Sequence, residues 1–238
     1  LGIAKAAISA GAKIYENSPA LSYKVNDDYV KVITKEGSIK AARVVLACNG
    51  YLDNLEKSLT SKILPMNNYI VATKPLDNQT IKKINPRDIA FADSRFVINY
   101  FRLSADKRLL FGGGENYSQE LSSNIIPIVT KPLEKIYPFL KGVKIDFAWG
   151  GKLAITMNRL PFFKTLHEDK VISAQGYSGQ GVALASYSGK IVSEKITGNG
   201  ETFDIMAKIP RQSFPGGRFL RNPSMKLGML YYALMDRL

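Results

Sequence analysis

The segment GYSGQGVALASYSGKIVSEKITG, residues 176–198, joins a glycine- and serine-rich start to a helical pattern. The strand-like KVISAQ precedes it, so we expect a strand, a glycine-rich turn and a helix in succession. A helix start carries backbone N–H groups without intrahelical acceptors and the positive end of the helix dipole. Glycines let a ligand approach that backbone closely. The segment therefore favours binding of an anion or of a group that acquires negative charge.

The spacing of these glycines is G-x-x-G-x-G and differs from the dinucleotide-binding G-x-G-x-x-G, and no strand pattern follows to close a βαβ unit. An isolated glycine cluster is equally consistent with tight packing of strand on helix. Two more glycine segments, CNG at 48–50 and WGG at 149–151, also stand at ends of apolar strands. Ligand crevices of open α/β sheets form at strand ends, so the three segments together predict a ligand site.

The elements that position these segments follow from hydrophobic periodicity. Residues 1–11 read as an amphipathic helix, and AKIYENSPALSYKV reads as a short strand, a crossing and a second strand. An antiparallel meander then leads to VVLAC at 44–48, whose consecutive apolar residues are typical of a strand covered on both faces in a parallel sheet. We expect the meander to precede a buried central strand.

A second region, from about 63 to 146, contains longer alternating strands: PMNNYIVATKPL, SRFVINYFRLS and RLLFGGGE. They predict an antiparallel sheet with one face available to a ligand, its last two strands joined by a turn at ADK. A helix is expected over TKPLEKIYPFL, with Thr130 as N-cap and Pro132 in the first turn. The region after Gly198 reads as irregular.

Composition excludes several kinds of site. The chain has one cysteine, Cys48, and one histidine, His167, so we expect no disulfide, no metal site and a reducing cytoplasm. No apolar run approaches the roughly 20 residues that span a bilayer. The net charge is +13, but the basic residues are spread along the chain without a nucleic-acid-binding motif, so we expect no nucleic-acid partner.

Long segments resemble the C-terminal part of the FAD-dependent D-amino-acid-oxidase-like superfamily, which includes glycine and sarcosine oxidases. They are ARVVLACNGYLDNL, YFRLSADKRLLFGGG, YPFLKGVKIDFAWGGKLAITMNRLPFF and VISAQGYSGQGVALASYSGKIVSEKITG. The closing segment from Phe203, with CNGYLDNLE and NYFRLS, is similar to the γ-glutamylputrescine oxidoreductase subfamily, which oxidises the amine of a polyamine derivative. The resemblance covers essentially the whole chain and implies a cytoplasmic flavoprotein of polyamine catabolism.

The resemblance implies an α/β (α+β) fold, with an FAD-binding domain of the glutathione-reductase-like type interrupted by an antiparallel substrate domain. The expected parts are FAD-binding residues 1–62 and 147–200, substrate-binding residues 63–146, and a basic tail, 201–238. The family's first βαβ unit, with its G-x-G-x-x-G, precedes the helix that starts this sequence, and residues 1–238 contain no such motif. We therefore expect an N-terminally truncated piece.

The resemblance also implies cofactor-binding positions. In the family, these positions provide a backbone group near adenine, a strand end along the cofactor, a residue close to the flavin ring and a turn that faces the pyrimidine edge of the ring. The matching residues here are Ala20, Ala47, Gly50, Gly151, Gly176, Ser178, Gly179, Gln180, Gly181 and Val182. The stretch KLAIT after the Trp-Gly region has no cysteine, so we expect FAD to bind non-covalently. A helix start near the ring would stabilise the charge of the reduced flavin.

The substrate side is less defined by sequence. Aromatic side chains suit a cationic amine, and the candidates are Tyr69, Tyr100, Trp149 and Lys152. For the three aromatic residues, packing in the core or on a sheet face is the favoured interpretation, and Lys152 is equally consistent with a surface position. No acid/base pair stands out, so no catalytic residue is assigned. The neighbourhood of Gly151 has no arginine to clamp an α-carboxylate, which favours an amine. The alternatives are an amino-acid or N-methyl-amino-acid oxidase or dehydrogenase of the same superfamily, and a non-catalytic basic module that binds polyanions.

Overall fold

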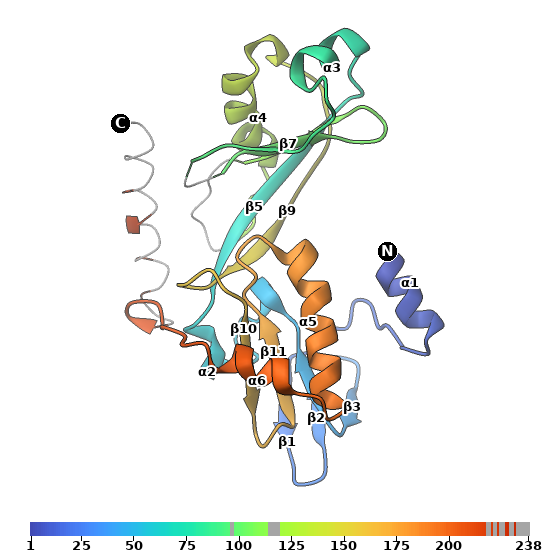
Figure 1. Cartoon of the computed structure of the whole chain (residues 1–238), viewed down its shortest axis with the longest axis vertical. Coiled ribbons are helices and arrows are strands. Elements are labelled where there is room, and N and C mark those ends of the chain that lie inside the picture. Colours follow the sequence, from blue (N-terminus) through green and yellow to red (C-terminus); the bar gives the residue numbers. More distant parts are fainter. Residues whose placement is uncertain are drawn as a thin grey trace.

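The computed structural model describes residues 1–95, 98–113 and 120–217 and the single positions 220, 223, 227, 228 and 231. Figure 1 shows an elongated molecule with a lower and an upper part, joined by two long paired strands. These are β5 (Leu64–Thr73) and β9 (Ile145–Ile155), which pair antiparallel along nearly their whole length. In the described part of the chain, no helix has the length and apolar character needed to cross a membrane.

The lower part contains two three-stranded sheets. One is an antiparallel meander of β1 (Ser22–Val25), β2 (Val30–Ile33) and β3 (Ser38–Ala41). The other has the order β10-β11-β4, formed by β10 (Phe162–Leu166), β11 (Val171–Gln175) and β4 (Val44–Leu46). Strand β4 pairs parallel with β11, which confirms the prediction that VVLAC joins a parallel pair.

Two helices follow β11 and cover one face of its sheet. They are α5 (Gly181–Ile196) and α6 (Glu201–Lys208), and their buried Ile191, Val192 and Phe203 pack on Phe163 and Ile172. The opposite face packs on the meander and on the segment after β4. The N-terminal end of α5 is its upper end and points toward the upper part (Figure 1).

The upper part is a five-stranded antiparallel sheet in the order β6-β7-β8-β5-β9. Its remaining strands are β6 (Phe91–Ala92), β7 (Tyr100–Leu103) and β8 (Leu109–Gly112). Helices α3 (Asn78–Ile84) and α4 (Ile125–Ile136) lie on one face (Figure 1) and cover a core that includes Tyr69, Val71, Phe111, Val129 and Leu133. Among the residues that the structure describes, no helix lies on the other face.

Four shorter elements complete the described chain. They are α1 (Gly2–Ser9), the 3₁₀ turn η1 (Asn49–Tyr51), α2 (Lys57–Thr60) and the 3₁₀ turn η2 (Pro138–Leu140). Helix α1 has no buried residue and lies beside the lower part (Figure 1).

Several local predictions are wrong. Residues 12–15 form no strand, and β4 is an edge strand whose Val45 is 40% exposed, so it is not covered on both faces. Helix α4 begins at Ile125, six residues before the expected start at Lys131, so Asn124 and not Thr130 is its N-cap residue. The reason is that Ile125–Val129 supply apolar residues that pack on the core. The region after Gly198 is not irregular, since α6 forms there around buried Phe203.

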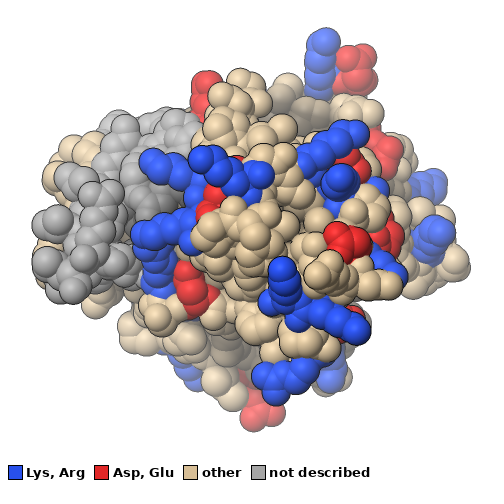
Figure 2. Space-filling model, turned by 90° about the horizontal axis from the view of Figure 1, so that it is seen from above, with Lys and Arg blue, Asp and Glu red and all other residues tan. Residues whose placement is uncertain are grey.

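Basic side chains do not gather into one stripe on the face that is seen from above. Figure 2 shows Lys and Arg interspersed with Asp and Glu over the described part of this face. This arrangement agrees with the expectation from the sequence that the net charge of +13 is distributed over the surface.

Candidate active site

Hydrogen bonds fix the glycine-rich turn between β11 and α5 to two other segments of the chain. The Ser178 amide donates to the Ala154 carbonyl at 2.9 Å, and Thr156 N–H donates to the Ser178 hydroxyl oxygen at 3.2 Å. The Gly176 amide donates to Oδ1 of Asn49 at 3.1 Å. The turn is thus fastened to the end of β9 and to the residue that follows the β4 segment.

The turn needs glycine for two separate reasons. Gly176 has φ +80, and a Cβ there would lie 2.6 Å from the Thr156 side chain, so both conformation and space exclude a larger residue. Gly179 has φ +94, but a Cβ there would meet no atom within 4 Å. At Gly179 the backbone faces open space, which is the feature required for close approach of a ligand.

The start of α5 is open as well. Gly179 and Gln180 are exposed, and Val182 is 98% exposed. The N-cap residue, Gln180, makes no side-chain capping hydrogen bond, and the first N–H groups of a helix have no intrahelical acceptor. The positive end of the dipole of this 16-residue helix therefore faces an uncovered region.

Two glycines of the neighbouring segments have different surroundings. Gly50 is buried, and a Cβ there would lie 2.5 Å from the Lys152 carbonyl oxygen, so this glycine allows η1 to pack on β9. A Cβ on Gly151 would meet only the Tyr51 hydroxyl, at 3.4 Å. Gly151 thus has room beside it, and Gly50 does not.

Tyr51 is a residue that sequence reasoning missed. Its hydroxyl accepts a hydrogen bond from Lys152 N–H at 3.0 Å, its ring centroid lies 5.8 Å from Lys152 Nζ, and it is 53% exposed. Its position directly after CNG, at the end of the β4 segment, was the available signal. Tyr51 brings the end of that segment into contact with β9 beside Gly151.

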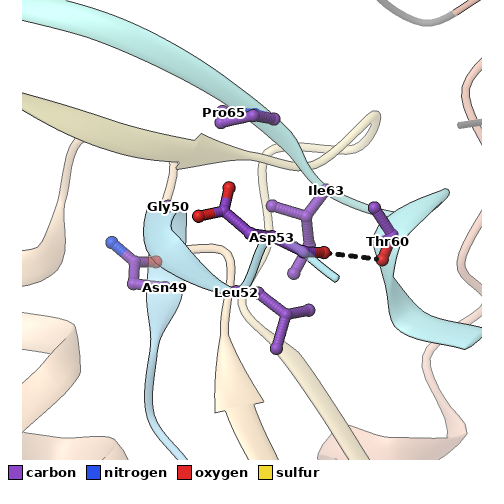
Figure 3. A pocket seen from close by; sticks show the side chains of 7 residues that line it. All are labelled: Asn49, Gly50, Leu52, Asp53, Thr60, Ile63 and Pro65. Atoms are coloured by element: carbon purple, nitrogen blue, oxygen red, sulfur yellow. Dashed lines mark hydrogen bonds between the residues drawn. The ribbon is translucent and has the colours of Figure 1, made fainter. Parts of the chain in front are cut away.

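A small cavity lies behind this region, lined by Asn49, Gly50, Leu52, Asp53, Thr60, Ile63 and Pro65 (Figure 3). Its volume of about 10 Å³ is the space of one water molecule. One wall is fixed by the Thr60 hydroxyl, which donates to the Asp53 carbonyl at 3.2 Å. The cavity is therefore too small for a substrate.

Cys48 adjoins this region and is half-buried. Burial raises the pKa of its thiol, its own backbone hydrogen bond opposes that shift, and the Asp53 carboxylate adds to it. A raised pKa keeps the thiol protonated at neutral pH and makes it a poor nucleophile.

The face of the upper sheet opposite α3 and α4, here called the open face, is defined by strand register. One row across the sheet is Trp149, Ile70, Gly112 and Tyr100, and the next is Phe147, Ala72, Leu110 and Arg102. Trp149 is 45% exposed and Phe147 is 57% exposed. The open face thus presents aromatic side chains to its surroundings.

Tyr100 is the residue of the first row whose side chain makes a hydrogen bond. Its hydroxyl donates to Oδ1 of Asn68 at 2.6 Å, and its ring occupies the place where a Cβ on Gly112 would be. Burial raises the pKa of Tyr100, and the hydrogen bond to Asn68 partly opposes that shift. Tyr100 therefore stays a neutral hydrogen-bonding group at physiological pH.

Two of the four residues predicted for substrate binding lie elsewhere. Tyr69 is fully buried among the residues beneath α4, and its hydroxyl accepts a hydrogen bond from Ser122 N–H at 3.0 Å. Lys152 lies against Tyr51 at the junction of η1 and β9. The Tyr69 and Lys152 side chains lie on the side of the sheet opposite the open face, because successive side chains of β5 and β9 point to opposite faces.

The residues predicted to bind the cofactor fall into two groups, one close together in space and one apart from it. The structure brings Gly50, Gly151 and the turn from Gly176 to Val182 together around β9 and Asn49. Ala20 lies in an exposed segment before β1, and Ala47 is exposed directly after β4. Among the described residues, no group of His, Cys, Asp and Glu is arranged to hold a metal ion.

Comparison with known proteins finds relatives that match over the whole chain. The chain is 36% identical over 239 residues to the gamma-glutamylputrescine oxidoreductase of Escherichia coli, covering 100% of this chain and 56% of that protein. It is 39% identical over 237 residues to the Rhizobium meliloti protein named "Probable oxidoreductase OrdL", covering 100% of this chain and 55% of that protein. The chain thus spans about half of the length of these relatives.

The fold is shared with a solved oxidase structure. Glycine oxidase from Geobacillus kaustophilus superposes with a TM-score of 0.69 at 20% identity, over 88% of this chain and 56% of that chain. The sequence profile of the family described as FAD dependent oxidoreductase, DAO, matches residues 1–195. This chain therefore belongs to the DAO family of FAD-dependent oxidoreductases.

Proposed function

We propose that this chain supplies the flavin-facing turn and the substrate-facing sheet of an enzyme that oxidises the C–N bond of an amine. Since the chain spans about half of its relatives' length, the activity of the whole protein is part of the proposal. The observation that carries it is the uncovered backbone at Gly179 and the start of α5, together with the room beside Gly151.

These features fit the family's cofactor. The residues that would hold the flavin are Gly50, Gly151, Gly176, Ser178, Gly179, Gln180, Gly181 and Val182, with Ala20 and Ala47 nearer the other parts of FAD. When bound, flavin supplies a two-electron acceptor that becomes negatively charged on reduction. The start of α5 would stabilise that charge by about 0.3–1 kcal/mol, and the open glycine backbone would let the ring approach.

The proposed reaction removes a hydride, that is two electrons and one proton, from the carbon beside the nitrogen of the neutral amine, with bound flavin as the acceptor. The nitrogen then loses a second proton, which leaves an imine. Water then adds to the imine, and the C–N bond breaks to give an aldehyde and the freed amine or ammonia. The side chains of the open face contribute orientation, because substrate positioning supplies much of the barrier lowering in such reactions. No general base is assigned.

The substrate is proposed to be an amine similar to γ-glutamylputrescine, the compound named in the Escherichia coli relative. Trp149 and Tyr100 would form the wall for its cationic chain, whereas Tyr69 is left out because it is buried in the core. The alternative of an amino-acid or N-methyl-amino-acid oxidase remains a second candidate, since glycine oxidase shares the fold.

The division into parts is also proposed. Residues 1–62 and 147–200 would form the FAD-binding domain of the glutathione-reductase-like type, with 63–146 as the inserted substrate domain and 201–238 as a tail. Strand β9 runs across the proposed boundary between 146 and 147, and β5 begins directly after the boundary between 62 and 63. Cys48 has a raised pKa and lies outside the KLAIT stretch, which supports non-covalent FAD.

The test uses the full-length gene product. We expect a flavin absorbance spectrum, release of the flavin on acid denaturation, and aldehyde formation from γ-glutamylputrescine detected by mass spectrometry. Gly151→Val, which fills the space beside Tyr51, should lose flavin, whereas Gly37→Val, at another glycine with open surroundings, should retain it. Salt-dependent nucleic-acid binding without a flavin spectrum would support the polyanion-binding alternative and overturn the proposal.

A further inference from the structure

We propose that Arg102 binds a carboxylate at the far end of the amine substrate, so that the enzyme prefers amines that carry a remote carboxylate. This inference rests on the proposed function above and names the substrate class of the same site. It is carried by the position of Arg102 on the open face and by the absence of an acidic partner for its guanidinium among the described residues.

Register places Arg102 on the same face as Tyr100. Phe101 pairs with Phe111, and their rings stack at 5.4 Å over the helix-covered core. Residues on either side of Phe101 therefore point to the opposite face. The Tyr100 ring confirms this direction, because it lies across Gly112 in the adjacent strand.

The Arg102 guanidinium forms no ion pair with an acidic side chain among the described residues. Arg102 is exposed, and within the described part of the chain its guanidinium makes one hydrogen bond, from Nη1 to the Leu103 carbonyl at the long distance of 3.5 Å. By contrast, Arg108 on the same hairpin pairs with Asp106 at 2.6 Å and with Asp146 at 2.5 Å. A guanidinium with its donors available is suited to bidentate binding of a carboxylate.

The side chains that neighbour Arg102 in its row carry no charge. The other members of its row are Leu110, Ala72 and Phe147, so none of them offers a carboxylate. The row nearer to Gly151 contains Trp149 and Tyr100, which suit the cationic chain. Both rows thus carry an exposed aromatic side chain, and Arg102 adds a cation to the row that lies farther from the proposed flavin position.

The dimensions agree with a substrate charged at both ends. Along β9, Gly151 and the row of Arg102 are four residues apart, which is roughly 13 Å, and three strand spacings across the sheet add roughly 14 Å. The diagonal between the two backbones is thus about 19 Å. An extended γ-glutamylputrescine spans about 12 Å from its amine to its α-carboxyl carbon, at roughly 1.2 Å per bond. The long arginine side chain covers the rest.

The test compares two substrates in the flavin-loaded full-length protein. γ-Glutamylputrescine and N-acetylputrescine share the amine end and the amide, and only the first carries a carboxylate. We expect Arg102→Ala to raise KM for γ-glutamylputrescine about 10- to 100-fold, the loss typical of a hydrogen-bonded charged pair, and to leave KM for N-acetylputrescine within about twofold. Arg102→Lys should retain part of the binding.

Controls separate charge from structure. Lys82→Ala removes an exposed cation from α3, on the helix-covered side, and should leave both KM values unchanged. The FAD content and melting temperature of each variant should equal those of the wild type. Calorimetric binding of glutarate to wild type and Arg102→Ala provides a second readout that does not depend on turnover.

Each result decides between the two proposals. Equal effects of Arg102→Ala on both substrates, or no effect on either, would overturn the role of Arg102 while amine oxidation stands. A wild type that oxidises neither amine would overturn the proposed substrate, and glutarate binding that is lost in Arg102→Ala would then still support the carboxylate site. Glutarate binding that is unchanged by the substitution would exclude it.

Discussion

The amide of Gly176 donates a hydrogen bond to Oδ1 of Asn49, 127 residues earlier in the chain, at 3.1 Å. This bond connects the end of β11 to the segment after β4, so that the glycine-rich turn and the CNG segment are held together. Asn49 itself has φ +49, a conformation that asparagine adopts more readily than most residues. One side chain thus stabilises two segments of the proposed flavin site.

Asn49→Ala should lower the free energy of unfolding by about 2 kcal/mol, from an unsatisfied amide and from the left-handed backbone. Asn17→Ala is the matched control, because Asn17 has φ +53 in an exposed turn and should lose only about 1 kcal/mol. Urea denaturation measures both. Equal losses would show that the bond to Gly176 contributes nothing to stability.

Gly179→Ala should weaken flavin binding about tenfold, because the new methyl group projects into the space proposed for the ring. Gly142→Ala is its control, since Gly142 also has positive φ, +74, and open surroundings. Each variant should lose about 1 kcal/mol of stability. Fluorescence titration with FAD distinguishes them, and similar affinities for the two variants would argue against the proposed flavin position.

Tyr100→Phe should lower kcat/KM for the amine about tenfold, because the ring proposed to line the substrate loses the 2.6 Å hydrogen bond to Asn68 that holds it in place. One hydrogen bond of this kind corresponds to about 1.4 kcal/mol. Tyr137→Phe makes the same chemical change at the end of α4 and should leave kcat/KM unaltered. Steady-state kinetics with unchanged FAD content is the measurement. A loss in both variants would indicate a general packing effect.

Glu56 predicts a pH dependence of stability. Burial raises the pKa of its carboxyl, but hydrogen bonds from the Ser58 side chain, from Tyr23 and from the Ser58 amide outweigh that effect and lower the pKa below its ordinary value. The stabilisation is therefore present above the unfolded-state pKa of about 4.3 and is lost as pH falls through the lower folded-state pKa.

Glu56→Gln should accordingly make the decline of unfolding free energy less steep below about pH 4.5. Glu36→Gln serves as control, because Glu36 is exposed on the β2–β3 turn and its nearest cation, Lys35, is 4.0 Å away. Urea denaturation from pH 6 to pH 3 measures the slope. The same slope in wild type and Glu56→Gln would refute the assignment.

Much of the local architecture could be predicted from the sequence. The succession of β11, glycine-rich turn and α5 and the β7–β8 hairpin follow from short-range hydrophobic periodicity and turn residues. The DAO family membership likewise follows from residues that the sequence displays directly. Such features depend on a few neighbouring residues, so a single sequence is enough to reveal them.

Tertiary structure decided which side chains share a site. Tyr69 and Tyr100 look alike in their strand patterns, yet the pairing of β5, β8 and β7 places Tyr69 under α4 and Tyr100 on the open face. Tyr51 reaches Gly151 only because η1 packs on β9. The sequence alone determines the period of each strand, whereas the pairing between distant strands selects the face, because a shift by one residue would exchange the two faces.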